Sequence, residues 1–152
     1  MARALGFRKL LVPVADNVES ERAMDAACRL AADHGAAVAA VSVIEVPPVL
    51  PLDSHMTTEE AAAHRLLERA AAVADSYGVT VAPRILRGRS AADAIVAQAE
   101  QRHTELVVIG APRKRRRAFG STVEHVLKKA PCRVLVIAEP APAASLAHTA
   151  AA

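Results

Sequence analysis

Five short runs of aliphatic residues, separated by four segments of helical periodicity, limit what this chain can fold into more than any other feature of its sequence. The runs are almost continuous in Val, Leu, Ile and Ala, which is typical of strands buried on both faces of a parallel sheet. Strands that alternate with helices in this way predict an α/β fold with helices on both faces of the sheet. We expect strands at residues 8–14, 38–46, 79–86, 105–110 and 133–138, and helices at 16–34, 57–77, 90–101 and 121–130.

The order of the strands follows from the rules for parallel sheets. Right-handed crossovers leave few arrangements, and Pro83 favours an edge position for the third strand because proline donates no ladder hydrogen bond. We therefore predict the order 3-2-1-4-5, in which the chain reverses direction between the first and fourth strands. Ligands of open α/β sheets bind at the carboxyl ends of the strands beside such a switch point. The loops at 13–17 and 110–121 meet there, so functional residues are expected in them.

Each predicted helix begins with a polar residue that is followed three positions later by an acid. This spacing is typical of a capping box, in which the two side chains bind the free N–H groups at the helix start. Glycines mark two of the helix ends, Gly35 and Gly78. The four predicted capping boxes are Asp16–Glu19, Thr57–Glu60, Ser90–Asp93 and Ser121–Glu124.

Composition narrows the class of protein further. The 152 residues suit one domain, and the aromatic content of 2% predicts an aliphatic core and argues against base-stacking surfaces for single-stranded nucleic acid. Cys28 and Cys132 lie far apart in apolar runs, so we expect reduced core thiols in a cytosolic protein. With neither a membrane-length apolar run nor a signal peptide, we expect a cytoplasmic location and no membrane insertion. Residues 140–152 are rich in Ala and Pro and are expected to form a flexible tail.

The segment after the fourth predicted strand carries the clearest functional signal. Gly110 follows the strand, and Gly120-Ser121-Thr122 opens the last helix. Backbone N–H groups and hydroxyls at a helix start form a natural phosphate site. A simpler interpretation is that Ser121 only caps the helix and Gly120 only makes the turn. The local sequence leaves both interpretations open.

Five consecutive basic residues, Arg113 to Arg117, lie in the same segment. The chain has a net charge of +3, and without this run the balance would be −2, so the basic character is local. The run could bind phosphate, because arginine matches phosphate geometry, or bind nucleic acid through charge, or be a solvated loop. The acidic remainder of the chain disfavours nucleic acid as a partner.

Motifs of catalysis are missing from the sequence. The six histidines are scattered without metal-ligand spacing, and no Walker A, G-x-G-x-x-G or G-x-S-x-G pattern occurs. We therefore expect no metal site and no enzyme activity beyond slow incidental hydrolysis of ATP.

Several segments together resemble the universal stress protein family. They are Lys9–Val14, Val41–Val46, Val107–Gly110 and, most specifically, Gly120–Val136, within a resemblance that spans about residues 7–139. The resemblance implies one flavodoxin-like domain, similar to adenine nucleotide α-hydrolases, with a five-stranded parallel sheet and two helices on each face. It also implies that ATP or another adenine nucleotide can bind, with Mg only beside ATP. Dimerisation is implied through the last strand, at Arg133, Val134, Leu135, Val136 and Ile137.

The family's nucleotide motif is altered in two places. Arg113 stands where the motif has its second glycine, and the stretch before Gly120 is shorter. Ala15 stands where the family has Asp, with Asp16 one position later as a substitute for the ribose contact. The resemblance further implies that Pro13 and Val43 flank adenine. The implied nucleotide-binding set is Pro13, Val14, Ala15, Asp16, Val43, Gly110, Arg113, Gly120, Ser121 and Thr122, of which Gly110, Gly120, Ser121 and Thr122 would cradle phosphate.

Two functional hypotheses follow. The first is a universal-stress-type regulatory protein that binds an adenine nucleotide at the switch point and forms homodimers through its fifth strand. The second is a nucleotide-independent interaction module that acts through dimerisation or through a membrane-transporter partner.

Overall fold

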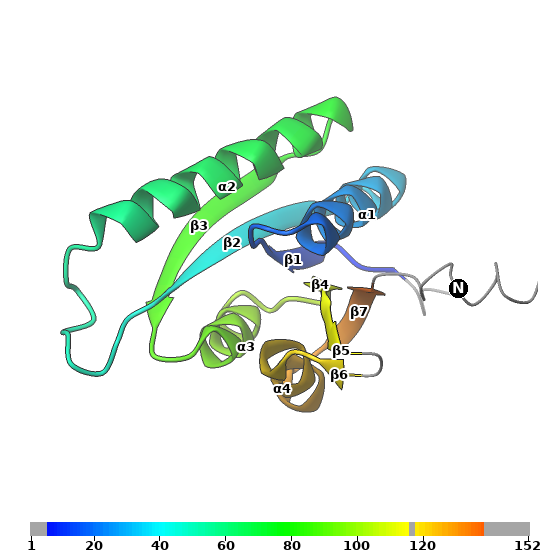
Figure 1. Cartoon of the computed structure of the whole chain (residues 1–152). Coiled ribbons are helices and arrows are strands. Elements are labelled where there is room, and N and C mark those ends of the chain that lie inside the picture. Colours follow the sequence, from blue (N-terminus) through cyan, green and yellow to red (C-terminus); the bar gives the residue numbers. More distant parts are fainter. Residues whose placement is uncertain (1–5, 116–117, 139–152) are drawn as a thin grey trace, which may run out of the picture.

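The computed structural model describes residues 6–115 and 118–138, and of residues 113–115, 118 and 119 it describes the backbone alone. Its centre is a five-stranded parallel sheet in the order β3-β2-β1-β4-β7 (Figure 1). Because β7 is the fifth predicted strand, the predicted order 3-2-1-4-5 is confirmed. The strands are β1 (Lys9–Pro13), β2 (Ala37–Glu45), β3 (Val81–Gly88), β4 (Leu106–Ala111) and β7 (Arg133–Ala138).

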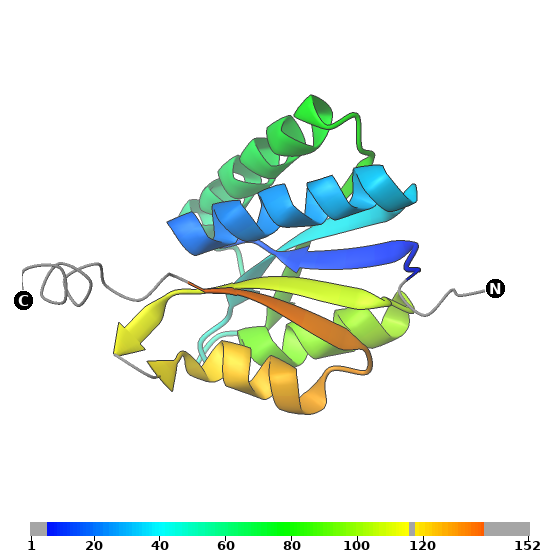
Figure 2. The ribbon, with the colours of Figure 1, turned by 90° about the vertical axis from the view of Figure 1, so that its right-hand side faces the viewer.

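Two helices cover each face of the sheet, as predicted (Figures 1 and 2). Helices α1 (Val18–His34) and α2 (Thr57–Ser76) pack on one face, and α3 (Ala91–Gln101) and α4 (Ser121–Lys129) on the other. Side chains of a strand alternate between the faces, so Leu10 and Val12 contact the α1–α2 layer while Leu11 contacts the α3–α4 layer. Both layers are almost wholly aliphatic, which agrees with the scarcity of aromatic residues.

The predicted cap of α1 is wrong by one residue. Asn17, not Asp16, is the N-cap, and its side chain accepts a hydrogen bond from the backbone N–H of Ser20 at 2.7 Å. The Asp16 carboxylate instead accepts a hydrogen bond from the guanidinium of Arg69 on α2 at 3.3 Å. The predicted end at Gly35 is confirmed by its left-handed backbone, with a φ of 63°.

Of the other predicted capping boxes, only the Ser90 half of the box at α3 is found, because the Asp93 carboxylate lies beside His125. The Ser90 hydroxyl accepts from the N–H of Asp93 at 3.3 Å. Thr57 is the first helical residue of α2, and Met56 before it has no side-chain oxygen to cap the helix. The Glu60 carboxylate accepts a hydrogen bond from Arg87 of β3. Gly120 precedes α4, so Ser121 is the first helical residue and does not cap it.

The loop after β4 holds a feature that periodicity did not predict. Strands β5 (Arg113–Arg115) and β6 (Ala118–Phe119) form a short antiparallel pair beyond the edge of the main sheet. Two strands this short, one of them entirely basic, show no apolar alternation from which a strand could be recognised.

Both cysteines are free thiols, as predicted. Cys28 is fully buried in α1, and Cys132 is half-buried before β7. Burial, with a smaller contribution from the Asp25 carboxylate, raises the pKa of the Cys28 thiol to about 11. No helix within residues 6–115 and 118–138 is long and apolar enough to span a membrane. The predicted tail at 140–152 lies outside the described residues.

Candidate functional site

A cavity of about 270 Å³ opens where the carboxyl ends of β1 and β4 diverge, and we call it the switch-point cavity. This is the place that the predicted strand order assigns to a ligand. Of the ten residues proposed for nucleotide binding, eight line the cavity: Pro13, Val14, Ala15, Val43, Gly110, Gly120, Ser121 and Thr122. The side chain of Arg113 lies outside the described residues, and Asp16 does not line the cavity.

Seven further lining residues were missed by sequence reasoning. Asn17 and Ser20 belong to the start of α1, and their spacing as a cap and its partner was the signal that could have identified them. Ala91 and Ile95 come from the first turns of α3, which reaches the cavity only through the tertiary fold. The other three are Ile109, Pro112 and Val123.

The cavity has an apolar part and a polar part. Ile95 and Ile109 are buried and Val43 is half-buried, and together they give one part an aliphatic wall. The polar part is the start of α4, where Ser121, Thr122 and the backbone of Gly120 line the cavity. An apolar ring and an anionic group joined in one small molecule would match these two parts.

The start of α4 lacks a side-chain cap. Gly120 has no side-chain acceptor, and the first backbone hydrogen bond of the helix runs from the N–H of Glu124 to the Gly120 carbonyl at 3.2 Å. The N–H groups of residues 121–123 precede that bond and have no partner within the helix. Together with the partial positive charge of a helix start, these donors favour an anion.

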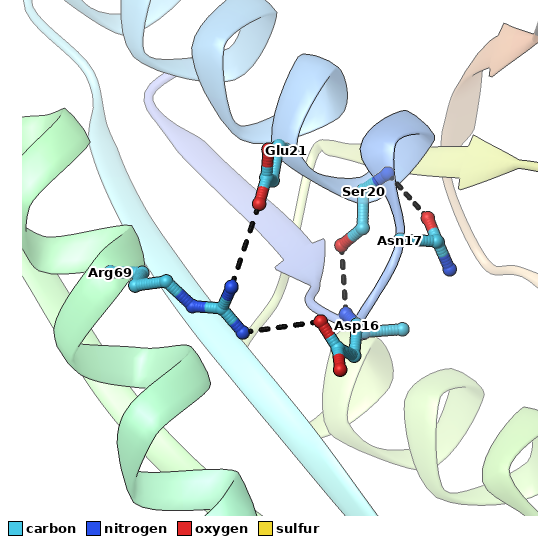
Figure 3. Close-up of polar contacts among 6 residues, drawn as sticks. Asp16, Asn17, Ser20, Glu21 and Arg69 are labelled. Carbon is cyan, nitrogen blue, oxygen red and sulfur yellow. Dashed lines mark hydrogen bonds and ion pairs between the residues drawn. The ribbon is translucent and has the colours of Figure 1, made fainter.

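The loop between β1 and α1 forms one wall of the cavity, and hydrogen bonds fix its shape. The N–H of Ala15 donates to the Ser20 hydroxyl at 2.7 Å, and the N–H of Ser20 donates to the Asn17 side-chain oxygen at the same distance. Figure 3 shows Asn17 on one side of this loop and Asp16 reaching toward Arg69 on the other. Neighbouring residues of the loop therefore face different surroundings.

A second cavity, of about 220 Å³, lies on that other side between α1 and α2. Arg69 stands at it, between the Asp16 carboxylate at 3.3 Å and the Glu21 carboxylate at 3.6 Å (Figure 3). The Asp16 side chain is 84% exposed in this position. The carboxylate proposed for ribose is thus directed toward α2 and away from the switch-point cavity.

Gly110 has a packing role in addition to its place in the lining. A Cβ at this position would lie 2.4 Å from the carbonyl carbon of Glu19 and 2.5 Å from the backbone nitrogen of Ser20. Only glycine allows β4 to approach the first turn of α1 this closely. Gly110 therefore sets the position of the cavity wall.

In the part of the chain that the structure describes, no three His, Cys, Asp or Glu side chains gather as metal ligands would.

The comparisons with known proteins agree with this architecture. The model of the universal stress protein family matches residues 6–138. This chain belongs to that family. It is 30% identical to a universal stress protein of Methanocaldococcus jannaschii, and the match covers 88% of this chain and 84% of that protein.

Solved universal stress proteins share the fold. One from Burkholderia pseudomallei is 25% identical, with a TM-score of 0.68 over 86% of this chain and 96% of its own. Another, solved in complex with cAMP, is 19% identical, with a TM-score of 0.69 over 89% of this chain and 99% of its own. The resemblance predicted from the sequence is therefore confirmed for the family and for the fold.

Proposed function

We propose that this universal stress protein binds an adenine nucleotide in the switch-point cavity. The phosphates would lie at the start of α4, on the N–H groups and hydroxyls of Ser121 and Thr122, and the base would lie between Pro13 and Val43. The observation that carries the proposal is the uncapped start of α4, which opens into a cavity with an aliphatic opposite wall. A universal stress protein of the same fold was solved with cAMP, which supports an adenine nucleotide as the ligand class.

The proposed role is binding and regulation. The lining side chains among the described residues are aliphatic, hydroxyl or amide groups, and none is a carboxylate, thiol or imidazole that could act as a general base. A bound nucleotide would stabilise the wall between β1 and α1 and the start of α4 together. Mg would accompany ATP, held by its phosphates.

A thermal-unfolding scan with Mg-ATP, AMP and cyclic AMP tests the proposal. A ligand at about 100 times its dissociation constant adds roughly 2.7 kcal/mol, which raises the midpoint of a domain this size by about 5–10 °C. We expect Ser121→Glu to abolish the rise, because its carboxylate repels phosphate while suiting the first turn of a helix. Thr58→Glu adds the same charge to the exposed first turn of α2 and should leave the rise intact.

No rise with any adenine nucleotide, in wild-type protein purified free of nucleotide, would contradict the proposal. A rise that Ser121→Glu and Thr58→Glu reduce equally would place the nucleotide away from α4. If no adenine nucleotide raises the midpoint, the better-supported function is that of a nucleotide-independent interaction module.

We further propose that the protein forms homodimers through β7. This strand is hydrogen-bonded to β4 on one side and lies at the edge of the sheet on the other, with its five residues from Val134 to Ala138 half-buried. An unpaired apolar edge favours pairing with a second copy. The proposed interface comprises Arg133, Val134, Leu135, Val136 and Ile137.

Light scattering of wild-type protein and of Val136→Lys tests this assembly. We expect a wild-type dimer and a monomeric variant, because the added charge would be buried at the centre of the paired edges. Leu127→Lys is the matched control, since Leu127 is 48% exposed on α4 and lies outside the proposed interface. A wild-type monomer would contradict the dimer proposal and leave the nucleotide proposal untouched.

A further inference from the structure

We infer that the switch-point cavity accepts ribonucleotides and 2′-deoxyribonucleotides with nearly equal affinity. The inference rests on the proposed function and adds that the site does not select for the 2′-hydroxyl of the sugar. It comes from the loop between β1 and α1, where the acid and the amide of two neighbouring residues lie on opposite sides (Figure 3).

Selection for ribose commonly uses a carboxylate that accepts a hydrogen bond from the 2′-hydroxyl. Asp16 is the acid of this loop, and its carboxylate lies on the α2 side, 3.3 Å from the Arg69 guanidinium. No acidic side chain lines the switch-point cavity among the described residues. The sugar would therefore meet this wall without a charged acceptor.

Two acids of neighbouring elements, Glu45 and Asp93, have partners of their own. The Glu45 carboxylate at the end of β2 accepts from the N–H of Ala91 at 3.1 Å. The Asp93 carboxylate of α3 lies 2.8 Å from the imidazole of His125 on α4. Neither residue lines the cavity, so neither replaces Asp16.

The polar side chains that this wall does present are neutral. The Asn17 oxygen already accepts from the N–H of Ser20, and the amide also has two N–H donors. The Ser20 oxygen already accepts from the N–H of Ala15. Neutral hydrogen bonds contribute up to about tenfold in affinity, and those to charged groups contribute more. A missing 2′-hydroxyl should thus change the affinity little.

The test compares the dissociation constants of Mg-ATP and Mg-dATP by isothermal titration calorimetry. For the wild-type protein we expect the two to differ by less than about tenfold. Asn17→Asp should still cap α1, because Asp caps as well as Asn, while it places a carboxylate in the cavity wall. We expect this variant to favour ATP over dATP by about tenfold or more. The ratio of the two dissociation constants is informative even if the added charge weakens the binding of both nucleotides.

Asp16→Asn is the matched control, because it removes the acid that Arg69 holds. Its ratio of ATP to dATP affinity should equal that of the wild type. A wild-type preference for ATP of tenfold or more would overturn the inference and leave the proposed function standing. So would a selective loss of ATP affinity in Asp16→Asn, or equal affinities in Asn17→Asp. If neither nucleotide binds the wild type, the proposed function itself fails, and this inference fails with it.

Discussion

The starts of α1 and α4 border the same cavity, yet only the start of α1 has a side-chain cap. At α1, Asn17 caps the N–H of Ser20, and Gly110 of β4 packs against the turn. At α4, Gly120 precedes the helix and provides no side-chain cap. A helix start with a side-chain cap and close packing serves as a fixed wall, whereas one without a side-chain cap can receive a charged ligand.

This difference separates stability from binding within one site. Substitutions at the start of α1 should act mainly on the free energy of unfolding, because they disturb contacts that exist without a ligand. Substitutions at the start of α4 should act mainly on ligand affinity.

Gly110→Ala should destabilise the protein most. The new Cβ would meet backbone atoms of Glu19 and Ser20 at 2.4–2.5 Å, so the start of α1 has to move away from β4. We expect a loss of about 3 kcal/mol in the free energy of unfolding, measured by urea denaturation. Gly88→Ala is the control, because its Cβ would meet only ordinary contacts, the nearest being the Ala94 Cβ at 3.5 Å. Equal stability of the two variants would show that the start of α1 can move away from β4 at little cost in free energy.

The fold was predictable from the sequence because hydrophobic runs can be recognised from neighbouring residues and the crossover rule holds for parallel sheets in general. The bounds of β7, at Arg133–Ala138, were predicted to the residue, since charge and the end of the apolar run mark them. The same rules predicted which loops meet, and eight of the ten proposed residues consequently line one cavity. Whether they contact a nucleotide stays a prediction.

Contacts between distant residues account for what the sequence did not show. Asp16 has Glu19 three positions later and so fits a capping box better than Asn17, which has Ser20 there. In the structure, however, the Asp16 carboxylate lies beside Arg69, 53 residues away, and Asn17 is the cap. Ile95 reaches the cavity from α3 only because α3 and α4 pack on the same face of the sheet. Local pattern carries no information about either contact.

The two helix starts should also respond differently when each loses one polar side chain. Asn17→Ala removes the acceptor that binds the N–H of Ser20 at 2.7 Å, and loss of an N-cap costs about 1 kcal/mol. Ser121→Ala removes a hydroxyl that caps nothing in the described chain, so stability should change by less than about 0.5 kcal/mol. Urea denaturation of both variants without ligand makes the comparison. A larger loss in Ser121→Ala would show that its hydroxyl stabilises α4 before any ligand binds.

Arg69→Met should have the smallest effect, although it removes both ion pairs of the loop. The Arg69 side chain is 54% exposed and its partners Asp16 and Glu21 are 84% and 62% exposed, and pairs this exposed contribute little. We expect at most about 0.5 kcal/mol in the free energy of unfolding at low ionic strength, and less at 0.5 M salt. Ser20→Ala should cost more, about 1 kcal/mol, because the N–H of Ala15 loses its acceptor. If Arg69→Met proved the more damaging of the two, the ion pairs with α2, and not the hydrogen bonds within the loop, would hold the cavity wall in place.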